Sequence, residues 1–319
     1  MAAAGGTPSD DLVSAPGKLF LVGEYAVLEG APAVVAAVDR RVTGRFVPGA
    51  EASSPLIAAA LRVVREHLVD AFPEGAPVLD SSSLMAGDRK LGLGSSAAVA
   101  AAAVGAILQA AGRDLEESDA IAFKLAFEAH RVAQGGRGSG ADVAAAVYGG
   151  ILRYERPRGA EPRIGFLPPL PAELVVFSTG SPSPTVDHLR AVERLAAHDP
   201  DLYAARILDL RTAAEAFLGA HEAENPRALI AAADAAGAAL DAFGRDADFP
   251  IVIPALGFAA KLARELGGAA KPSGAGGGDV GVGFFASAEA AEAFRARAPH
   301  LGLEILSISA TARGLDRGI

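Results

Sequence analysis

The chain has 319 residues, of which 51% are hydrophobic and 21% charged, with a formal net charge of −9 at pH 7 and no cysteine. This length suits one large domain or two of medium size, and the acidic balance excludes a general binder of nucleic acid or anionic membranes. The lack of cysteine excludes disulfides, thiolate metal sites, iron–sulfur clusters and thiol nucleophiles, and any anionic ligand requires a local cluster of positive groups.

The N-terminal segment MAAAGGTPSDD lacks the basic and then apolar regions of a signal peptide. The longest uncharged apolar run lies within residues 97–108 and is shorter than the roughly 20 residues that span a bilayer. We therefore expect a soluble, cytoplasmic protein.

The first half of the chain alternates short strands with helices. Residues 12–47 contain apolar runs bounded by glycine and proline, which predicts strands and hairpins, and residues 54–72 have apolar side chains at helical spacing. We expect a loop over 73–90, a helix beginning near Ser95, and an amphipathic helix capped by Asp114. A glycine-rich loop, a short helix and the strand ILRYE follow.

The proline-rich stretch from Pro157 to Pro171 is the best candidate for a domain boundary, which divides the chain into residues 1–170 and 171–319. After it, ELVVFSTG is predicted as a buried strand, KPSGAGGGDVGVGFF as a loop joined to a strand, and LEILSIS as a strand. Helices are predicted around 187–198, 201–220, 226–243, 254–267 and 287–297. The pattern is α+β, without internal repeats.

The stretch KLGLGSSAAVAAAAVGAIL at residues 90–108 has three interpretations. It is a simple helix start, a weak dinucleotide fingerprint formed by Gly92, Gly94 and Ala97 with Asp114 beyond, or a phosphate cradle. The fingerprint lacks a good preceding strand, and Asp114 follows the helix instead of ending a strand. A cradle would use close backbone approach and helix N–H groups.

Three further features bear on that choice. Five glycines lie within residues 274–281, between KPS and an apolar strand, where a flexible linker would be out of place although glycine runs are often linkers. Lys18 stands on a Pro-Gly turn that enters an apolar strand, and Asp142 stands at a helix start. Taken singly, Lys18 is better explained as a solvated lysine and Asp142 as a helix cap. The Walker sequence of P-loop enzymes is absent.

Taken in order, three segments resemble the signature motifs of the GHMP kinase superfamily. They are PGKLFLVGEYAVL at 16–28, GLGSSAA at 92–98 and KPSGAGGGD at 271–279. The details GEYAV, KLGLGSS, GSGADVA and SGAGGGD are most similar to the phosphomevalonate kinase branch, and Asp279 favours that branch over mevalonate kinases. Leu91 replaces the usual aromatic residue, Val280 a frequent cysteine, and His130 stands about where mevalonate kinases carry a magnesium-binding glutamate.

The resemblance implies an α+β, two-domain GHMP kinase fold, with a ribosomal protein S5 domain 2-like N-terminal domain and a ferredoxin-like C-terminal domain. It implies ATP-dependent, Mg²⁺-assisted phosphorylation of mevalonate 5-phosphate to mevalonate 5-diphosphate, a step of isoprenoid synthesis, by a monomer or homodimer. Glu128 is a further candidate metal ligand near His130. The partner is a small molecule, with neither nucleic acid nor membrane involved.

The resemblance also assigns site residues. Lys18 and Asp142 are the catalytic pair, and Ser96 is the expected magnesium-associated hydroxyl. The residues expected to bind ATP are Lys90, Gly92, Leu93, Gly94, Ser95, Ser96, Ala97, Ser273, Gly274, Ala275 and Gly276. Those expected to bind the acceptor are Lys18, Tyr25, Arg137, Ser139, Gly140, Asp142, Gly277 and Asp279.

The acceptor decides the expected role of Asp142. The second pKa of a phosphate monoester is about 6, so a general base has little to remove, and we expect Asp142 mainly to orient Lys18. We expect a cluster of cations beside the glycine motifs, with Arg137 and Lys90 at the 5-phosphate. Its members are Lys18, Arg89, Lys90, Arg131, Arg137 and Lys271, and His130 adds possible charge.

Other functions remain open at this stage. A mevalonate kinase or another small-metabolite kinase of the same superfamily is the nearest alternative. The superfamily's decarboxylases fit less well, because they normally lack the Pro-Gly-Lys entry. A non-catalytic ligand sensor on the same fold and a dinucleotide-dependent oxidoreductase are more distant alternatives.

Overall fold

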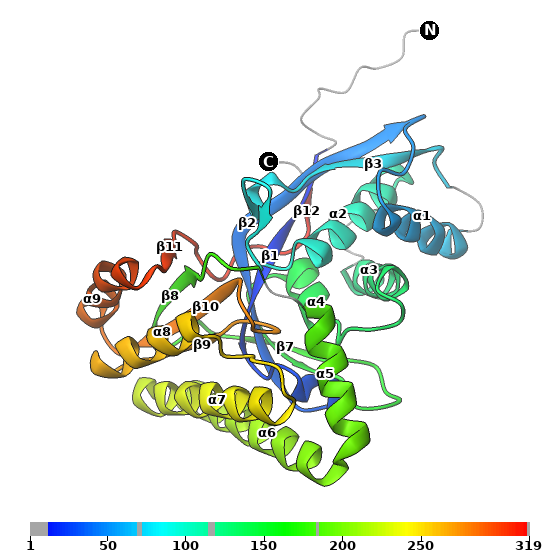
Figure 1. Ribbon diagram of the computed structural model, residues 1–319. Helices are drawn as coiled ribbons and strands as arrows, with labels where there is room; N and C mark the ends of the chain where they lie inside the picture. The colour runs from blue at the N-terminus through cyan, green and yellow to red at the C-terminus, as the bar shows by residue number, and fades with distance from the viewer. Residues whose placement is uncertain (1–11, 69–71, 114–118, 183–184, 318–319) are drawn as a thin grey trace, which may run out of the picture.

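A computed structural model describes residues 12–68, 72–113, 119–182 and 185–317. Two main antiparallel sheets organise this part of the chain (Figure 1). Helices α1, α2 and α3 lie together on one side of the first sheet, whereas α6 and α7 lie side by side at another end of the molecule.

The first sheet has the strand order β12-β1-β2-β6-β7, and β3 pairs with the outer part of β2. Every residue of β1 is buried, because its faces are covered by helices and by other parts of the chain. The strands are β1 (Val13–Val22), β2 (Ala33–Pro48), β3 (Gly75–Asp80), β6 (Ile151–Glu155), β7 (Arg163–Leu167) and β12 (Asp316–Arg317).

Helix α2 (Ser95–Ala110) lies at the centre of the helical layer. It packs against β1, β2 and three neighbouring helices, and nearly all of its alanines are buried. Alanine has a high helix propensity and a small side chain, so this helix can lie close to several elements at once. Its neighbours are α1 (Pro55–His67), α3 (Asp119–Ala133) and α4 (Ala141–Tyr148).

The second sheet has the order β11-β8-β10-β9, which in chain order is 4-1-3-2. The succession strand, helices, strand, strand, helix, strand is that of a ferredoxin-like unit. Its elements are β8 (Glu173–Ser178), β9 (Ala269–Pro272), β10 (Val280–Phe285) and β11 (Glu304–Leu306), with α8 (Pro254–Glu265) and α9 (Ala288–Arg297) packed on them. The expected α+β fold is confirmed.

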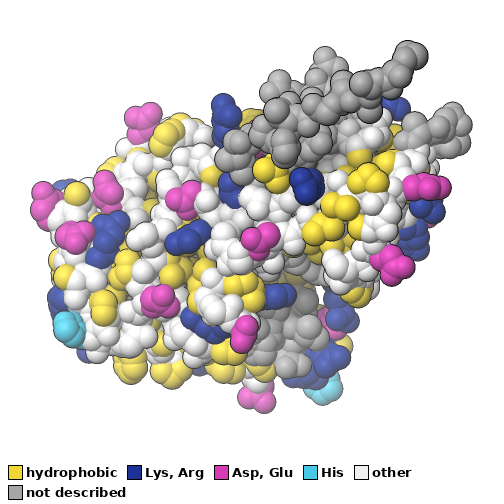
Figure 2. Space-filling view, turned by 90° about the horizontal axis from the view of Figure 1, so that it is seen from above, with side chains coloured by type: hydrophobic (Ala, Val, Ile, Leu, Met, Phe, Trp, Pro, Cys, Tyr) yellow, Lys and Arg dark blue, Asp and Glu magenta, His cyan; other side chains and the backbone are white. Residues whose placement is uncertain are grey.

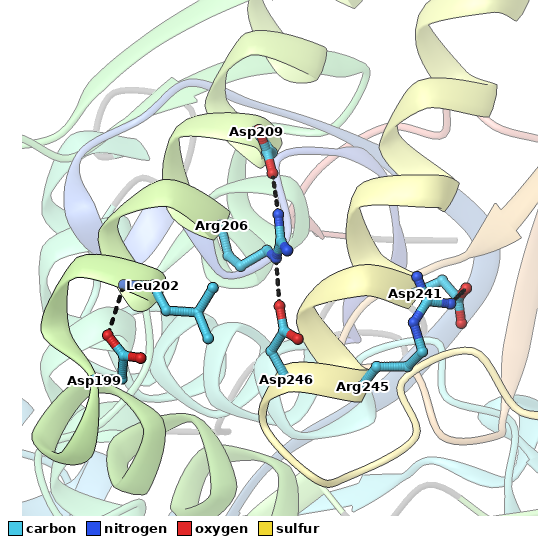
Figure 3. A network of polar contacts seen from close by, with 7 residues as sticks. All are labelled: Asp199, Leu202, Arg206, Asp209, Asp241, Arg245 and Asp246. Carbon is cyan, nitrogen blue, oxygen red and sulfur yellow. Dashed lines mark hydrogen bonds and ion pairs between the residues drawn. The ribbon is translucent and has the colours of Figure 1, made fainter.

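Helices α5 (Thr185–His198), α6 (Pro200–Glu222) and α7 (Pro226–Asp246) are inserted between β8 and β9. Asp199 caps α6 by accepting a hydrogen bond from Leu202 N at 3.0 Å, and a proline follows at the first helical position. Arg206 of α6 donates to Asp209 at 2.9 Å and to Asp246 of α7 at 2.6 Å (Figure 3). These contacts fix the α6–α7 pair.

Two regions expected to be loops contain strands. The segment 73–90 holds β3, a short helical turn η2 (Ser82–Leu84) and a hairpin of β4 (Met85–Ala86) and β5 (Arg89–Lys90), and the stretch 157–171 holds β7. Glycine and proline lower the strand signal in both regions, but β3 and β7 each pair with a single neighbour, where proline is tolerated. Asp114, expected as a helix cap, lies outside the described residues.

The C-terminal segment returns to the first sheet. Backbone bridges join Val38 to Ala310 and Gly149 to Arg313, and β12 pairs with the start of β1. Arg41 donates to the carbonyl oxygens of Arg313 at 2.7 Å and Gly314 at 2.6 Å. The tail therefore covers the turn that follows α4, although its sequence carries no strand signal.

Charged side chains of both signs are mixed on the face of the molecule that Figure 2 draws. Figure 2 shows lysine and arginine side chains interspersed with aspartate and glutamate over the face turned to the viewer. Among the described helices, none combines the length and the hydropathy needed to cross a membrane.

Replacing Gly149 with alanine should destabilise the fold through the tail contact. Gly149 has φ +72°, and a Cβ there would lie 2.2 Å from Gly314 N. Its ψ of −170° completes a conformation that essentially only glycine adopts, which costs alanine roughly 1–3 kcal/mol, and the overlap with backbone adds roughly 1–3 kcal/mol. Gly49→Ala is the matched control, since Gly49 has φ +74° with nothing within 4 Å. Urea unfolding should show the larger loss for Gly149→Ala, and equal losses would contradict this account.

Candidate active site

The three signature motifs, residues 16–28, 92–98 and 271–279, meet around Lys18. A Cβ on Gly94 would lie 2.7 Å from Lys18 Cγ, and a Cβ on Gly274 would lie 3.4 Å from Lys18 Nζ. A Cβ on Gly92 would lie only 2.4 Å from the Cβ of Asp279, in the third segment. Side chains of neighbouring motifs therefore occupy the space that a larger residue would need at 92 and 94.

Lys18 is held inside the protein by β1. Its backbone N–H donates to Leu93 O at 2.7 Å, and its Nζ lies 5.4 Å from the centroid of the Phe20 ring. The residue is only 8% exposed. Burial lowers the pKa of the Lys18 ammonium, and the negative charges of Asp142, Glu24 and Asp279 act in the opposite direction. Lys18 thus lies among acids from three separate segments.

The N-terminus of α2 offers backbone donors beside Lys18. Gly94 precedes the helix with φ +76°, and no side chain caps the helix start. Ser95 and Ser96 form the first turn, Leu93 and Ala97 are buried, and Ala97 N–H donates to Gly94 O at 3.1 Å. Uncapped N–H groups at a helix start, together with the helix dipole, favour an anion.

A small polar group joins α2, α3 and α4. His130 Nε2 lies 3.1 Å from Ser96 Oγ, 2.8 Å from Gln134 Nε2 and 3.9 Å from Asp142 Oδ2. The His130 side chain is 2% exposed, whereas that of Asp142 is 23% exposed. The imidazole therefore forms a buried backing for Ser96 and Asp142, and sequence reasoning had not linked the three.

The loop before α4 is fixed from both sides. Gly140 is the N-cap with φ +90°, and Ser139 Oγ accepts a hydrogen bond from Ala141 N at 3.3 Å. The carbonyl oxygen of Ser139 accepts one from the Tyr154 hydroxyl at 2.6 Å. Asp142 follows in the first turn of α4, where Oδ1 accepts from its neighbour Val143 N at 2.9 Å. A rigid loop thus presents Asp142.

The first half of the third glycine loop is bonded to the first motif. Phe20 N–H donates to Ser273 Oγ at 2.8 Å, and the Tyr25 hydroxyl donates to Ala275 O at 2.5 Å. Tyr25 was expected to bind the acceptor, but its hydroxyl is used by the loop. Burial raises the pKa of that hydroxyl well above its usual range.

The second half of the third loop is bonded to other segments. Gly277 N–H donates to Ile251 O at 2.7 Å, and Asp279 N–H donates to Ser181 O at 2.6 Å. Gly276 is buried against Ile251. The loop is therefore anchored along its length and is no flexible linker.

Several of the cations expected beside the glycine motifs are paired with acids. Three arginines each face an acid: Arg89 lies 3.8 Å from Glu304, Arg131 3.7 Å from Glu128, and Arg137 3.5 Å from Glu193. The acidic composition places carboxylates within reach of surface arginines, so charge pairs form instead of one positive patch.

Besides Lys18, that set contains two further lysines, Lys90 and Lys271, which have opposite environments. Lys90 lies exposed on the β4–β5 hairpin. Lys271 is buried and bonded to Glu24 at 2.5 Å. Lys18 is therefore the member that borders all three motifs, and Glu24 is a site residue that the sequence reasoning missed, although it stands within GEYAV.

The described residues contain no cluster of three or more His, Asp or Glu side chains that could hold a metal ion unaided. Ser96 and Asp142 nonetheless offer two oxygen atoms around one imidazole nitrogen. Oxygen ligands suit Mg²⁺, which usually binds through one or two protein groups together with substrate phosphates. The residues present therefore fit a magnesium ion that is held largely by a nucleotide.

Comparisons with known proteins agree with this geometry. The sequence profile of the GHMP kinases N terminal domain matches residues 55–150, and that of the GHMP kinases C terminal domain matches residues 226–302. A phosphomevalonate kinase of Streptomyces sp. (strain CL190) is 30% identical, over 84% of this chain and 88% of its own. A mevalonate kinase of Aeropyrum pernix is 31% identical, over 86% and 89%.

A solved structure shows the same fold. The Streptococcus pneumoniae phosphomevalonate kinase in complex with phosphomevalonate and AMPPNP superposes with a TM-score of 0.81, over 94% of this chain and 99% of that chain, at 20% identity. Together with the matched domains, the meeting of the three glycine motifs and the ferredoxin-like second sheet, these comparisons show that the chain belongs to the GHMP kinase family.

Proposed function

We propose that this kinase transfers the γ-phosphoryl group of ATP, with Mg²⁺, to mevalonate 5-phosphate and forms mevalonate 5-diphosphate. The observation that carries the proposal is the position of Lys18 between the start of α2 and the third glycine loop. The Streptomyces relative supports this acceptor, and so does the fold neighbour whose structure holds phosphomevalonate and AMPPNP.

The start of α2 is proposed to bind the triphosphate. Backbone amides of the GLGSS turn and the positive end of the helix dipole attract phosphate oxygens without adding net charge. The third loop, at Gly274, Ala275 and Gly276, would close the other side of the triphosphate. Lys90 is exposed on the β4–β5 hairpin, just before the GLGSS turn, and is proposed to contact the outer part of the nucleotide.

Lys18 is proposed to stabilise charge on the transferred group. Phosphoryl transfer is mostly positioning and charge neutralisation, so an ammonium that is shielded from water has a larger effect than an exposed one. The negative charge of Asp142 opposes the effect of burial and favours the charged form of Lys18. Because a phosphate monoester nucleophile is already largely ionised at neutral pH, Asp142 has little proton to remove and acts on Lys18.

Ser96 and Asp142 are proposed to hold Mg²⁺, which would neutralise phosphate charge when bound. His130 and Gln134 would fix the Ser96 hydroxyl so that an oxygen lone pair is available to the metal ion. Glu128 is a poorer candidate for a metal ligand, because it is exposed and paired with Arg131.

The acceptor is proposed to lie between the loop before α4 and the third glycine loop. Ser139, Gly140, Gly277 and Asp279 would contact it, with Arg137 near its 5-phosphate. Arg137 is half-exposed and paired with Glu193 at 3.5 Å, so binding the phosphate would require it to leave that partner. Arg156, which donates to Gly138 O at 3.2 Å, is a second guanidinium beside this loop that the sequence reasoning missed.

The division into domains 1–170 and 171–319 stays a prediction. Strand β8, which begins at Glu173, belongs to the second sheet, whereas β12 at the chain end belongs to the first.

Mevalonate kinase activity is the second candidate function, because the Aeropyrum relative and others of similar identity carry that name.

Lys18→Met should lower kcat by orders of magnitude and leave the fold intact. Methionine fills the buried volume but offers no charge to the transferred phosphoryl group. Lys124→Met, at an exposed lysine of α3, is the control and should have no effect. A coupled ATPase assay and a thermal unfolding curve measure both properties, and a drop of less than tenfold would remove Lys18 from the mechanism.

Acceptor choice separates the two candidate functions. Mevalonate 5-phosphate should be turned over far better than mevalonate, with galactose and homoserine inactive, in one assay with ATP and Mg²⁺. The reverse preference would identify a mevalonate kinase. Absence of turnover with all four acceptors would favour a ligand sensor, and a parallel titration with NAD tests the oxidoreductase alternative.

The pH profile should show the lowered pKa of Lys18. Below the folded pKa the ammonium is charged and active, and as pH rises through that pKa the charge and the activity are lost. Because burial lowers the pKa from 10.5, kcat/KM for ATP should fall at a lower pH than an ordinary lysine would predict. In Lys18→Arg, which stays charged, the alkaline fall should disappear even if the maximum rate is lower. An identical fall in both proteins would assign it to another group.

A further inference from the structure

A buried ion pair joins the first and third motifs. Lys271 Nζ lies 2.5 Å from Glu24 Oε1, and the two side chains are 0% and 3% exposed. Glu24 lies in the turn after β1, and Lys271 lies in β9. Neither has a part in the proposed chemistry, although both lie beside Lys18 and influence its charge.

The pair reaches the backbone of the third glycine loop. Lys271 Nζ also donates to Pro272 O at 2.6 Å, and Gly274 N–H donates to the same Glu24 Oε1 at 3.4 Å. Ser273 and Ala275 on either side are bonded to Phe20 and Tyr25. Three consecutive loop residues are therefore attached to the first motif, and the attachment of the middle one is the carboxylate of Glu24.

The turn that carries Glu24 is itself constrained. Gly23 has φ +96° and Tyr25 has φ +60°, so left-handed backbone flanks Glu24 on both sides. Such a conformation is costly for tyrosine and persists only where packing enforces it. The Tyr25 ring packs edge-on against Phe243 with centroids 5.3 Å apart. The direction of the Glu24 carboxylate is therefore set by the fold.

We propose that Glu24 is a positioning residue that holds Gly274, and with it the third glycine loop, at the distance from Lys18 that the ATP phosphates require. A Cβ on Gly274 would lie 3.4 Å from Lys18 Nζ, so a shift of this residue changes the space above the ammonium. Lys271 neutralises Glu24, because a bare carboxylate there would repel the phosphates. This inference rests on the proposed function.

The physical chemistry of buried pairs makes the proposal testable apart from stability. Removing one partner leaves an uncompensated buried charge, which destabilises a protein strongly. Replacing both partners by apolar side chains of similar size is often neutral. Single variants therefore leave an unbalanced charge, whereas an apolar double variant removes both bonds to the loop backbone and takes one charge of each sign away from Lys18.

The experiment compares Glu24→Leu/Lys271→Met with the wild-type chain. We expect an unfolding midpoint close to that of the wild type, at least a tenfold weaker binding of Mg²⁺·AMPPNP by calorimetry, and a tenfold or greater fall in kcat. The KM for the acceptor should change less than threefold, because Gly277 and Asp279 keep their own backbone bonds to Ile251 and Ser181. If the AMPPNP affinity and the kcat of the double variant both lie within twofold of the wild-type values, the pair is purely structural and the proposal is overturned.

A control and a second variant complete the test. Asp234→Leu/Arg264→Met removes a surface pair of 2.7 Å between α7 and α8 and should leave binding and kcat unchanged. Should the apolar double variant not fold, Glu24→Asp keeps the charge but withdraws the carboxylate from Gly274. It should weaken AMPPNP binding at nearly unchanged stability, and unchanged binding in it would equally overturn the proposal.

The two proposals fail in different ways. If the wild-type chain does not bind AMPPNP or phosphorylate mevalonate 5-phosphate, the proposed function is wrong. If the wild type does both and the Glu24 variants match it, only the role of Glu24 is wrong.

Discussion

The charge of Lys18 depends on a balance between burial and three carboxylates. Burial alone favours the neutral amine, and a neutral amine could not offset phosphate charge. Asp142, Glu24 and Asp279 oppose that effect from α4, from the turn after β1 and from the third glycine loop. Because each acid comes from a different segment, the carboxylates that favour the charged form of the buried Lys18 are brought together only by the fold. The electrostatic environment of Lys18 therefore depends on the folded arrangement of all three segments.

The glycines allow that assembly to be tight enough to exclude water. The side chains of Lys18 and Asp279 lie where Gly94 and Gly92 would otherwise carry a Cβ. An anion at the start of α2 would meet backbone N–H groups and the ammonium of the buried Lys18. Electrostatic interactions are stronger in such surroundings than in water. This arrangement would let a chain of net charge −9 bind a polyanion at one buried lysine.

The sequence predicted the parts of the molecule whose signals are local. Helical periodicity located α1 and α6 to α9, and the three motifs located the segments around Lys18. Strands β3, β7 and β12 were missed, because proline, glycine or short length hides an edge strand whose pairing partner is distant in the chain. The pairing of arginines with Glu193 and Glu304 was missed for the same reason, since it depends on tertiary structure.

The contact between Glu24 and Lys271 could not be predicted from the motifs that contain them. Both letters stand inside quoted motifs, yet their spacing of nearly 250 residues gives no hint that they form a buried pair. Once paired, they are electrically neutral towards a ligand, so they are unsuited to bind phosphate directly. What remains for them is geometry, because their bonds end on the backbone of Pro272 and Gly274. In the proposed mechanism the charged residues of the site are therefore of two kinds: Lys18 and Asp142 would face the ligand, and the buried pair would hold the loop that encloses it.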